Sequence, residues 1–168
     1  KCTYSCETYR HQLGKEFLQE LKKIKVPGYS RINTKTNLLE YIPPAYIHAH
    51  EVIIERQVYE DEDGYIKYGQ GINFESEPNK YLLVQPDVIF LDKEKNPILF
   101  IELIATHKIT DEKLARLKSI GINTVSVKIP KSSEEEIKNI FHSSNQTKWA
   151  YHYEQASSPS IPGANQNS

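Results

Sequence analysis

Two carboxylates, Asp87 and Glu102, interrupt two apolar stretches of the chain. Val84–Leu91 and Ile98–Thr106 are both apolar and rich in β-branched residues, and the polar residues Asp92–Pro97 separate them. This pattern predicts two strands joined by a short turn. A carboxylate in a buried strand costs free energy unless it is paired or binds a cation. Two such carboxylates on neighbouring strands therefore suggest a site for a divalent metal ion.

The alternation of side chains along a strand allows both carboxylates to lie on one face. Asp87 shares a face with Ile89, and Glu102 shares a face with Ile104. If the strands pair around the predicted turn, the two acids point the same way. Oxygen ligands of this kind suit Mg²⁺ or Mn²⁺. The alternative is structural, with Asp87 capping a strand end after Pro86 and Glu102 forming a salt bridge.

The segments before this hairpin predict a helix followed by antiparallel strands. Ser5–Lys25 has the periodicity of a helix that buries one face. Glu51–Tyr59 and Tyr65–Phe74 predict two strands joined by an acidic turn that ends in Asp-Gly. Arg31–His50 is expected to be irregular, because two consecutive prolines within it break any regular element.

After the hairpin, the pattern predicts a helix, a strand and a last helix. Thr110 is a good N-cap, and Gly121 is typical of the residue that follows a helix. Ile122–Ile129 alternates as a strand, and a strand, helix and strand with short links favour a right-handed crossover and a parallel pair. Ser132–Phe141 opens with a capping box and predicts a short helix.

Together these elements predict an α/β domain in which helices flank a mixed sheet that contains an antiparallel meander. The chain of 168 residues fits a single domain, 1–154, and a disordered tail, 155–168, rich in Ser, Pro, Gly, Asn and Gln. Because the sequence starts at Lys and contains no Met, we expect this domain to be the C-terminal part of a longer chain.

Composition bears on partners and compartment. The net charge of −1 gives no global basic field, so a nucleic acid would need a local basic patch. Candidate patches, which are also common on ordinary helix surfaces, are the crossover residues Lys108, Lys113, Arg116 and Lys118, and Lys15, Lys22, Lys23 and Lys25 on the first helix. No run is apolar enough to span a membrane, and the cysteine usage fits a cytoplasmic protein. A homodimer or a larger complex is compatible with the sequence.

Cys2 and Cys6 are spaced as in half of a zinc site. Only His11 lies near enough in the sequence to add a ligand, so Zn²⁺ binding here would require further ligands upstream of Lys1. The alternative is a pair of free thiols.

The layout and several motifs resemble the PD-(D/E)xK nuclease superfamily, which has a restriction-endonuclease-like core. Pro86-Asp87 on one strand and Glu102 on the next match the acidic pair of that family. The run FIELIATHKITDEKLARLKSIGINTVSVKIP and the segment CETYRHQLGKEF are similar to its CoiA-like branch of competence-protein-related, nuclease-like proteins. The resemblance covers roughly Cys2–Pro130.

This resemblance implies metal-dependent cleavage of DNA phosphodiester bonds, in a bacterial uptake, restriction or defence setting. Asp87 and Glu102 would hold Mg²⁺ or Mn²⁺, and Glu7 from the first helix would complete the ligands directly or through water. The metal ion would activate a water molecule and neutralise charge that develops on the phosphate.

One departure from the family pattern concerns the catalytic lysine, which normally lies two residues after the second acid. That position is Ile104 here. Lys113 on the crossover helix is the first candidate to replace it, ahead of Lys108, and His107 is a further candidate. Three functions stay open: an active nuclease, a nuclease-fold module that has lost catalysis and binds nucleic acid or a protein, and an unrelated interaction domain in which both acids are structural.

Overall fold

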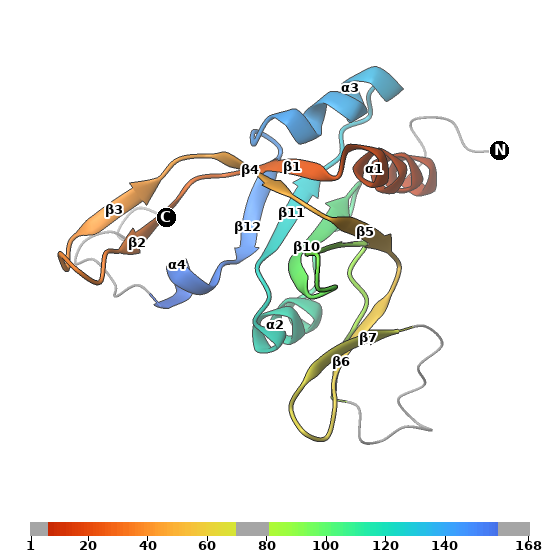
Figure 1. Ribbon diagram of the computed structural model, residues 1–168. Coiled ribbons are helices and arrows are strands. Elements are labelled where there is room, and N and C mark those ends of the chain that lie inside the picture. Colours follow the sequence, from red (N-terminus) through yellow and green to blue (C-terminus); the bar gives the residue numbers. More distant parts are fainter. Residues whose placement is uncertain (1–6, 70–80, 158–168) are drawn as a thin grey trace.

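The computed structural model describes residues 7–69 and 81–157. Its centre is a mixed sheet of five strands in the order β12-β11-β10-β9-β5 (Figure 1). The strands of this sheet are β5 (Glu51–Ile54), β9 (Val88–Leu91), β10 (Pro97–Ile104), β11 (Thr124–Lys128) and β12 (Thr147–Tyr151). Neighbours are antiparallel except β10 and β11, which are parallel. The predicted α/β class, the mixed sheet and the parallel pair are therefore confirmed.

Helices cover both faces of this sheet (Figure 1). α1 (Glu7–Leu21) and α3 (Glu134–Asn139) pack on one face, together with the 3-10 helix η1 (Ile140–His142). α2 (Asp111–Ile120) packs on the other face and links β10 to β11. A short helix, α4 (Tyr153–Ser157), follows β12.

Each face of the sheet buries its own hydrophobic cluster. Leu18 and Ile101 are fully buried in the cluster toward α1 and α3. Phe100 and Leu117 are fully buried in the cluster toward α2. Because side chains alternate along β10, Glu102 lies on the same face as Phe100, beneath α2.

Three smaller sheets surround the central one. β1 (Lys23–Val26) pairs with β4 (Ala45–His48), β2 (Tyr29–Ile32) pairs with β3 (Leu39–Ile42), and β6 (Gln57–Glu60) lies between β7 (Ile66–Gly69) and β8 (Tyr81–Val84). The β2–β3 and β6–β7 hairpins project away from the central sheet (Figure 1). The acidic turn predicted from the sequence joins β6 to β7.

Two predicted element boundaries are wrong because single residues have positive φ angles. α1 ends at Leu21 rather than Lys25, since Lys22 has a φ of 53° and β1 begins directly after it. The strand predicted at Glu51–Tyr59 is instead two strands, β5 and β6, which belong to different sheets and are separated at Glu55, where φ is 54°. In both places the backbone conformation ends the regular hydrogen bonding.

The prediction that Arg31–His50 is irregular is also wrong. β3 ends at Ile42, directly before the two prolines, and β4 begins at Ala45, directly after them. The prolines form the connection between two strands, a position where their missing N–H group costs nothing. Periodicity therefore failed here because these strands are short and only partly buried.

The C-terminal part contains two elements that the sequence analysis did not predict, β12 and α4. α4 includes the first residues of the predicted disordered tail, so the described chain is helical as far as Ser157. The rest of that tail lies outside the described residues, as do Cys2 and Cys6. Within residues 7–69 and 81–157, no helix is both long enough and apolar enough to cross a membrane.

The ends of α2 are capped as the sequence predicts. The hydroxyl of Thr110 accepts a hydrogen bond from the Lys113 amide at 3.2 Å. Gly121 follows the helix with a left-handed φ of 79°, and its amide donates to the Leu117 carbonyl. Thr110 thus fixes the first turn of α2 and Gly121 ends its last turn.

We predict that Thr110→Ala lowers the free energy of unfolding by about 1 kcal/mol, because an amide of the first turn loses its acceptor. Thr110→Ser keeps the hydroxyl and is expected to stay close to the wild-type value. Urea denaturation followed by circular dichroism measures both. Equal stability of Thr110→Ala and the wild type would show that this cap does not hold the helix.

Candidate functional site

The pairing of β9 with β10 places the two predicted acids side by side. Phe100 is opposite Ile89 and Ile101 is opposite Val88. Continuing this register by one residue sets Glu102 opposite Asp87, at the point where the chain enters β9. The two carboxylates therefore share the α2 face, as the alternation of the sequence predicts.

Main-chain groups hold Asp87 in position. Its Oδ2 accepts a hydrogen bond of 2.7 Å from the Leu103 amide, which belongs to β10. Its carbonyl accepts a bond of 3.2 Å from the amide of Glu55, the residue after β5. The side chain is half-buried. The sheet therefore fixes this carboxylate from both neighbouring strands.

Glu102 is almost fully buried, with 5% of its surface exposed. Its Oε2 accepts a hydrogen bond of 2.8 Å from the Lys113 ammonium group, which also donates to the Gln85 carbonyl at 3.1 Å. Its Oε1 is buried, and no hydrogen-bond partner for it occurs within the described residues. The Oε2 oxygen thus has a hydrogen-bond donor from α2, whereas the Oε1 oxygen has none among the described residues.

The surroundings of Glu102 favour its protonated form. Burial, and then the negative charge of Asp87, raise the pKa of Glu102 from 4.5 to about 7, against the opposing effect of Lys113. Without a bound cation, the two carboxylates are therefore not both fully ionised at neutral pH. A divalent cation at this point would favour the ionised form of both.

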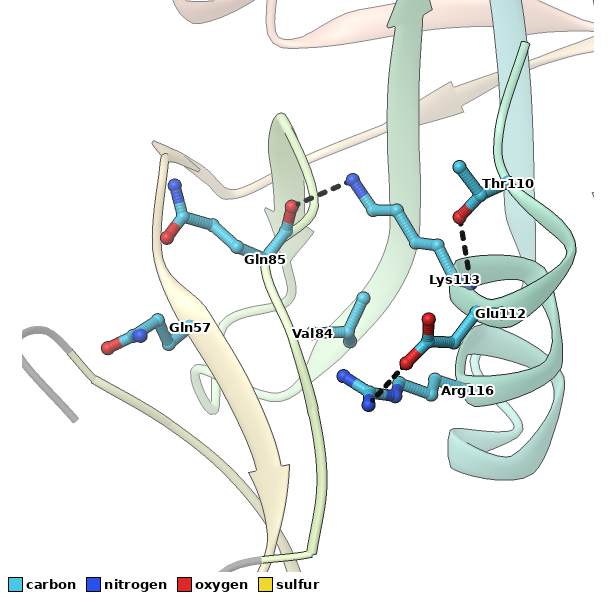
Figure 2. A pocket seen from close by; sticks show the side chains of 7 residues that line it. All are labelled: Gln57, Val84, Gln85, Thr110, Glu112, Lys113 and Arg116. Atoms are coloured by element: carbon cyan, nitrogen blue, oxygen red, sulfur yellow. Dashed lines mark hydrogen bonds and ion pairs between the residues drawn. The ribbon is translucent and has the colours of Figure 1, made fainter. Parts of the chain in front are cut away.

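A surface cleft of about 370 Å³ adjoins this acid pair on the side of β6 and β8. Figure 2 shows Lys113 extending from α2 across the cleft toward the backbone of Gln85. Arg116 lies one turn further along the helix and forms an ion pair with Glu112 at 2.8 Å. The remaining lining residues are Gln57, Val84 and Thr110. Two cationic side chains thus lie at the opening nearest to the acids.

The structure separates the three candidate basic residues for catalysis. Lys113 meets Glu102, although the two are on different elements. Lys108 is exposed and lines another pocket, on the side of β11 and β12. His107 is exposed in the loop between β10 and α2. Ile104 is half-buried on the α2 face, where the family lysine would lie. Of the candidates, Lys113 alone contacts the acid pair among the described residues.

The proposed third ligand, Glu7, lies at the first residue of α1, and its side chain is outside the described residues. Within the described part of the chain, no group of three or more His, Cys, Asp or Glu side chains could hold a metal ion. Of the three acids predicted as ligands, the structure describes the carboxylates of Asp87 and Glu102. Their chemistry fits Mg²⁺ or Mn²⁺, with water completing the coordination.

The lysines predicted to form a basic patch on the first helix do not lie together on that helix. Lys15 is buried and its ammonium group forms an ion pair of 2.6 Å with Glu55. Lys23 and Lys25 belong to β1, where both ammonium groups lie over the ring of Tyr46. The early end of α1 accounts for this difference, since it moves these lysines from the helix to a strand.

Sequence reasoning did not identify two contributors to the site. The Gln85 carbonyl binds the Lys113 ammonium group, and the Glu55 amide binds the carbonyl of Asp87. Both act through the main chain, so their residue types carry no signal of the role. The position of Gln85 directly before Pro86-Asp87 is the only hint in the sequence.

The fold and the site define a mixed α/β protein with a buried carboxylate, that of Glu102, next to a half-buried one and a lysine. Comparisons of the chain with protein-family models, with curated proteins and with solved structures find no match. The resemblance to the PD-(D/E)xK nucleases therefore stays a prediction that depends on the residues themselves.

We predict that the Glu102 carboxyl makes the metal-free protein less stable as pH rises. Because its folded-state pKa is about 7 against an ordinary value of 4.5, the folded state binds more protons than the unfolded state between these values. The protonated Glu102 carboxyl makes its full contribution to the free energy of unfolding below pH ~4.5. This contribution is lost as pH rises through about 7, and the loss amounts to up to about 3 kcal/mol.

The test is urea denaturation in EDTA at pH 5, 6, 7 and 8. Glu102→Gln cannot ionise, so it is expected to lose this part of the pH dependence and to gain stability relative to the wild type as pH rises. Glu135→Gln, which neutralises an exposed carboxylate on α3, serves as the control and keeps the wild-type slope. The same slope in Glu102→Gln would contradict the prediction.

Proposed function

We propose that this chain is a metal-dependent nuclease that cleaves DNA in the cytoplasm, with Asp87 and Glu102 as ligands of Mg²⁺ or Mn²⁺. The observation that supports this most directly is the buried Oε1 of Glu102, which lies beside a second carboxylate and has no described partner. A cation between the two carboxylates would supply that partner and offset the cost of burying them.

The arrangement of elements also supports this function. α1 precedes the antiparallel strands β5, β9 and β10, and α2 then crosses over to the parallel strand β11. This order matches the restriction-endonuclease-like core that the sequence resembles. We therefore propose that the central sheet is such a core, with its acids on the face beneath α2.

Each residue has a role that follows from its position. A bound divalent ion would lower the pKa of a water molecule and neutralise charge on the phosphate. Asp87 and Glu102 would hold the ion, and the Leu103 amide would keep the Asp87 carboxylate in one orientation. Lys113 would replace the missing lysine at position 104, because its ammonium group can orient a water molecule or a phosphate oxygen beside Glu102.

A second candidate is a nuclease-fold module that has lost catalysis and binds nucleic acid or a protein partner. The observation in its favour is Ile104, an apolar residue where the family has its lysine. The contact between Lys113 and Glu102 weakens the argument that Ile104 implies a loss of catalysis. A positively charged side chain from another element, α2, contacts the same acid.

We predict that Mg²⁺ and Mn²⁺ bind the wild type and that binding weakens at least tenfold in Asp87→Asn and in Glu102→Gln. Affinity is expected to increase from pH 6 to pH 8, because Glu102 must lose its proton before it binds a cation. Isothermal titration calorimetry measures both effects, and Glu135→Gln is the charge-matched control. Absence of binding in the wild type would overturn the metal site.

We further predict metal-dependent cleavage of plasmid or single-stranded DNA, reduced about 10²-fold in Lys113→Met through loss of a positioned cation. Lys131→Met removes an exposed lysine outside both candidate basic patches and is expected to keep full activity. A gel assay with each metal and with EDTA measures cleavage. Metal binding without cleavage of either substrate would favour the second candidate over an active nuclease.

A further inference from the structure

A second pocket, of about 510 Å³, lies on the other side of α2 from the cleft next to the acids. The loop between β10 and α2, the helix itself, and strands β11 and β12 enclose it. Three lysines line it: Lys108 from the loop, Lys128 from β11 and Lys148 from β12. They come from separate segments of the chain, so their convergence is a property of the fold.

The strand registers explain why these lysines converge. Lys128 pairs with Ile104 in the parallel ladder, and Lys148 pairs with Ser126 in the antiparallel one. Ser126 itself pairs with Glu102. Paired residues on neighbouring strands point to the same face, so both strand lysines lie on the α2 face that carries the acids.

The charge in this pocket is one-sided. All three lysines are exposed, and no ion pair of their ammonium groups occurs within the described residues. None of the described lining residues is acidic. Three like charges around one hollow raise the local positive potential and attract an anion, even though the whole chain is close to neutral.

Part of the pocket wall is apolar. Ile104, Ile109 and Leu114 line it, and all three are half-buried. Pockets of several hundred Å³ that combine an apolar wall with a few polar groups are typical of small-molecule sites. The combination fits an anion that carries a flat, largely apolar group, which describes a nucleotide better than an inorganic ion.

We propose that this pocket binds a nucleotide through its phosphate, with Lys128 and Lys148 as the main contacts and Lys108 at the edge. The half-buried Ser126 adds a hydroxyl donor, and the base lies against the wall formed by Ile109 and Leu114. The site requires no metal ion, so it goes beyond the proposed nuclease function.

The nucleotide has two possible sources, a nucleic-acid strand or a free nucleotide. Ile104 in the pocket wall and Glu102 in the acid pair lie two residues apart on the same face of β10, a separation of about 7 Å. Because α2 lies between the pocket and the acid pair, a single strand seated in the pocket would reach the acid pair only by passing around the helix. A free nucleotide would occupy the pocket alone.

The test is binding in EDTA of a fluorescently labelled single-stranded DNA decamer, measured by anisotropy at several salt concentrations. Lys128→Gln/Lys148→Gln is expected to weaken binding roughly tenfold and to reduce the slope of log K against log salt by about 1.4, since each lysine–phosphate contact contributes about 0.7. The matched control is Lys35→Gln/Lys93→Gln, which removes two exposed lysines outside the pocket and keeps wild-type binding.

The source of the nucleotide is resolved by titrating thymidine monophosphate and ATP. Isothermal titration calorimetry in EDTA, rather than tryptophan fluorescence, measures the binding of each nucleotide, because the indole of Trp149 packs on the other face of the sheet, where it donates to the Pro27 carbonyl. A heat of binding that the lysine variant loses identifies a free nucleotide as a ligand. Binding of the decamer without an effect of either nucleotide identifies a strand as the ligand. Absence of binding in the wild type, or equal binding by the two double variants, overturns the proposal.

This outcome is separable from that of the nuclease proposal. Binding of the decamer in EDTA, with no cleavage in the presence of any metal ion, would support the pocket proposal and overturn the nuclease proposal. If Lys128→Gln/Lys148→Gln changes neither metal-dependent cleavage nor binding of the decamer, the nuclease proposal stands and the pocket proposal is overturned.

Discussion

The burial of a carboxylate in a central strand is the constraint on which this structure depends. Glu102 lies in β10 between two paired strands and beneath α2, where an ionised carboxylate is costly. Three features of the structure are related to the cost of burying this charge. Lys113 reaches Glu102 from α2, the main chain before β9 binds the same ammonium group, and the pKa of the carboxyl rises. The contact between Lys113 and Glu102 thus links the position of α2 to this one buried carboxylate.

The contacts of the acid pair are compatible with a structural role and with the proposed catalytic role. Asp87 accepts a bond from a neighbouring strand and Glu102 forms a salt bridge, as the structural alternative expects. What that alternative leaves unexplained is the second oxygen of Glu102, buried beside another carboxylate without a described partner. A buried pair of acids is rarely kept for stability alone, because apolar residues of similar size would cost less.

α2 separates two sites of opposite character on one face of the sheet. Lys113 points toward the acid pair and its cleft, whereas the next residue, Leu114, lines the lysine pocket. The parallel pairing of β10 with β11 requires a crossover connection, and that connection places α2 on this face of the sheet. The proposed metal site and the proposed nucleotide pocket therefore lie on the two sides of one helix.

The single strand predicted at Val84–Leu91 is wrong in its bounds, because Val84 ends β8 and β9 begins only at Val88. The sequence by itself nevertheless determined the hairpin of β9 and β10, the shared face of Asp87 and Glu102, the caps of α2 and the parallel crossover. These follow from local rules of alternation, capping and connection, which act within about 20 residues. Only the tertiary structure decided that Lys113 meets Glu102, because the sequence ranks Lys113 ahead of Lys108 but does not place either ammonium group beside the acid. The same holds for Lys128 and Lys148, whose convergence depends on strand order. It also holds for the short strands around the prolines, whose pairing partners rather than their own pattern stabilise them.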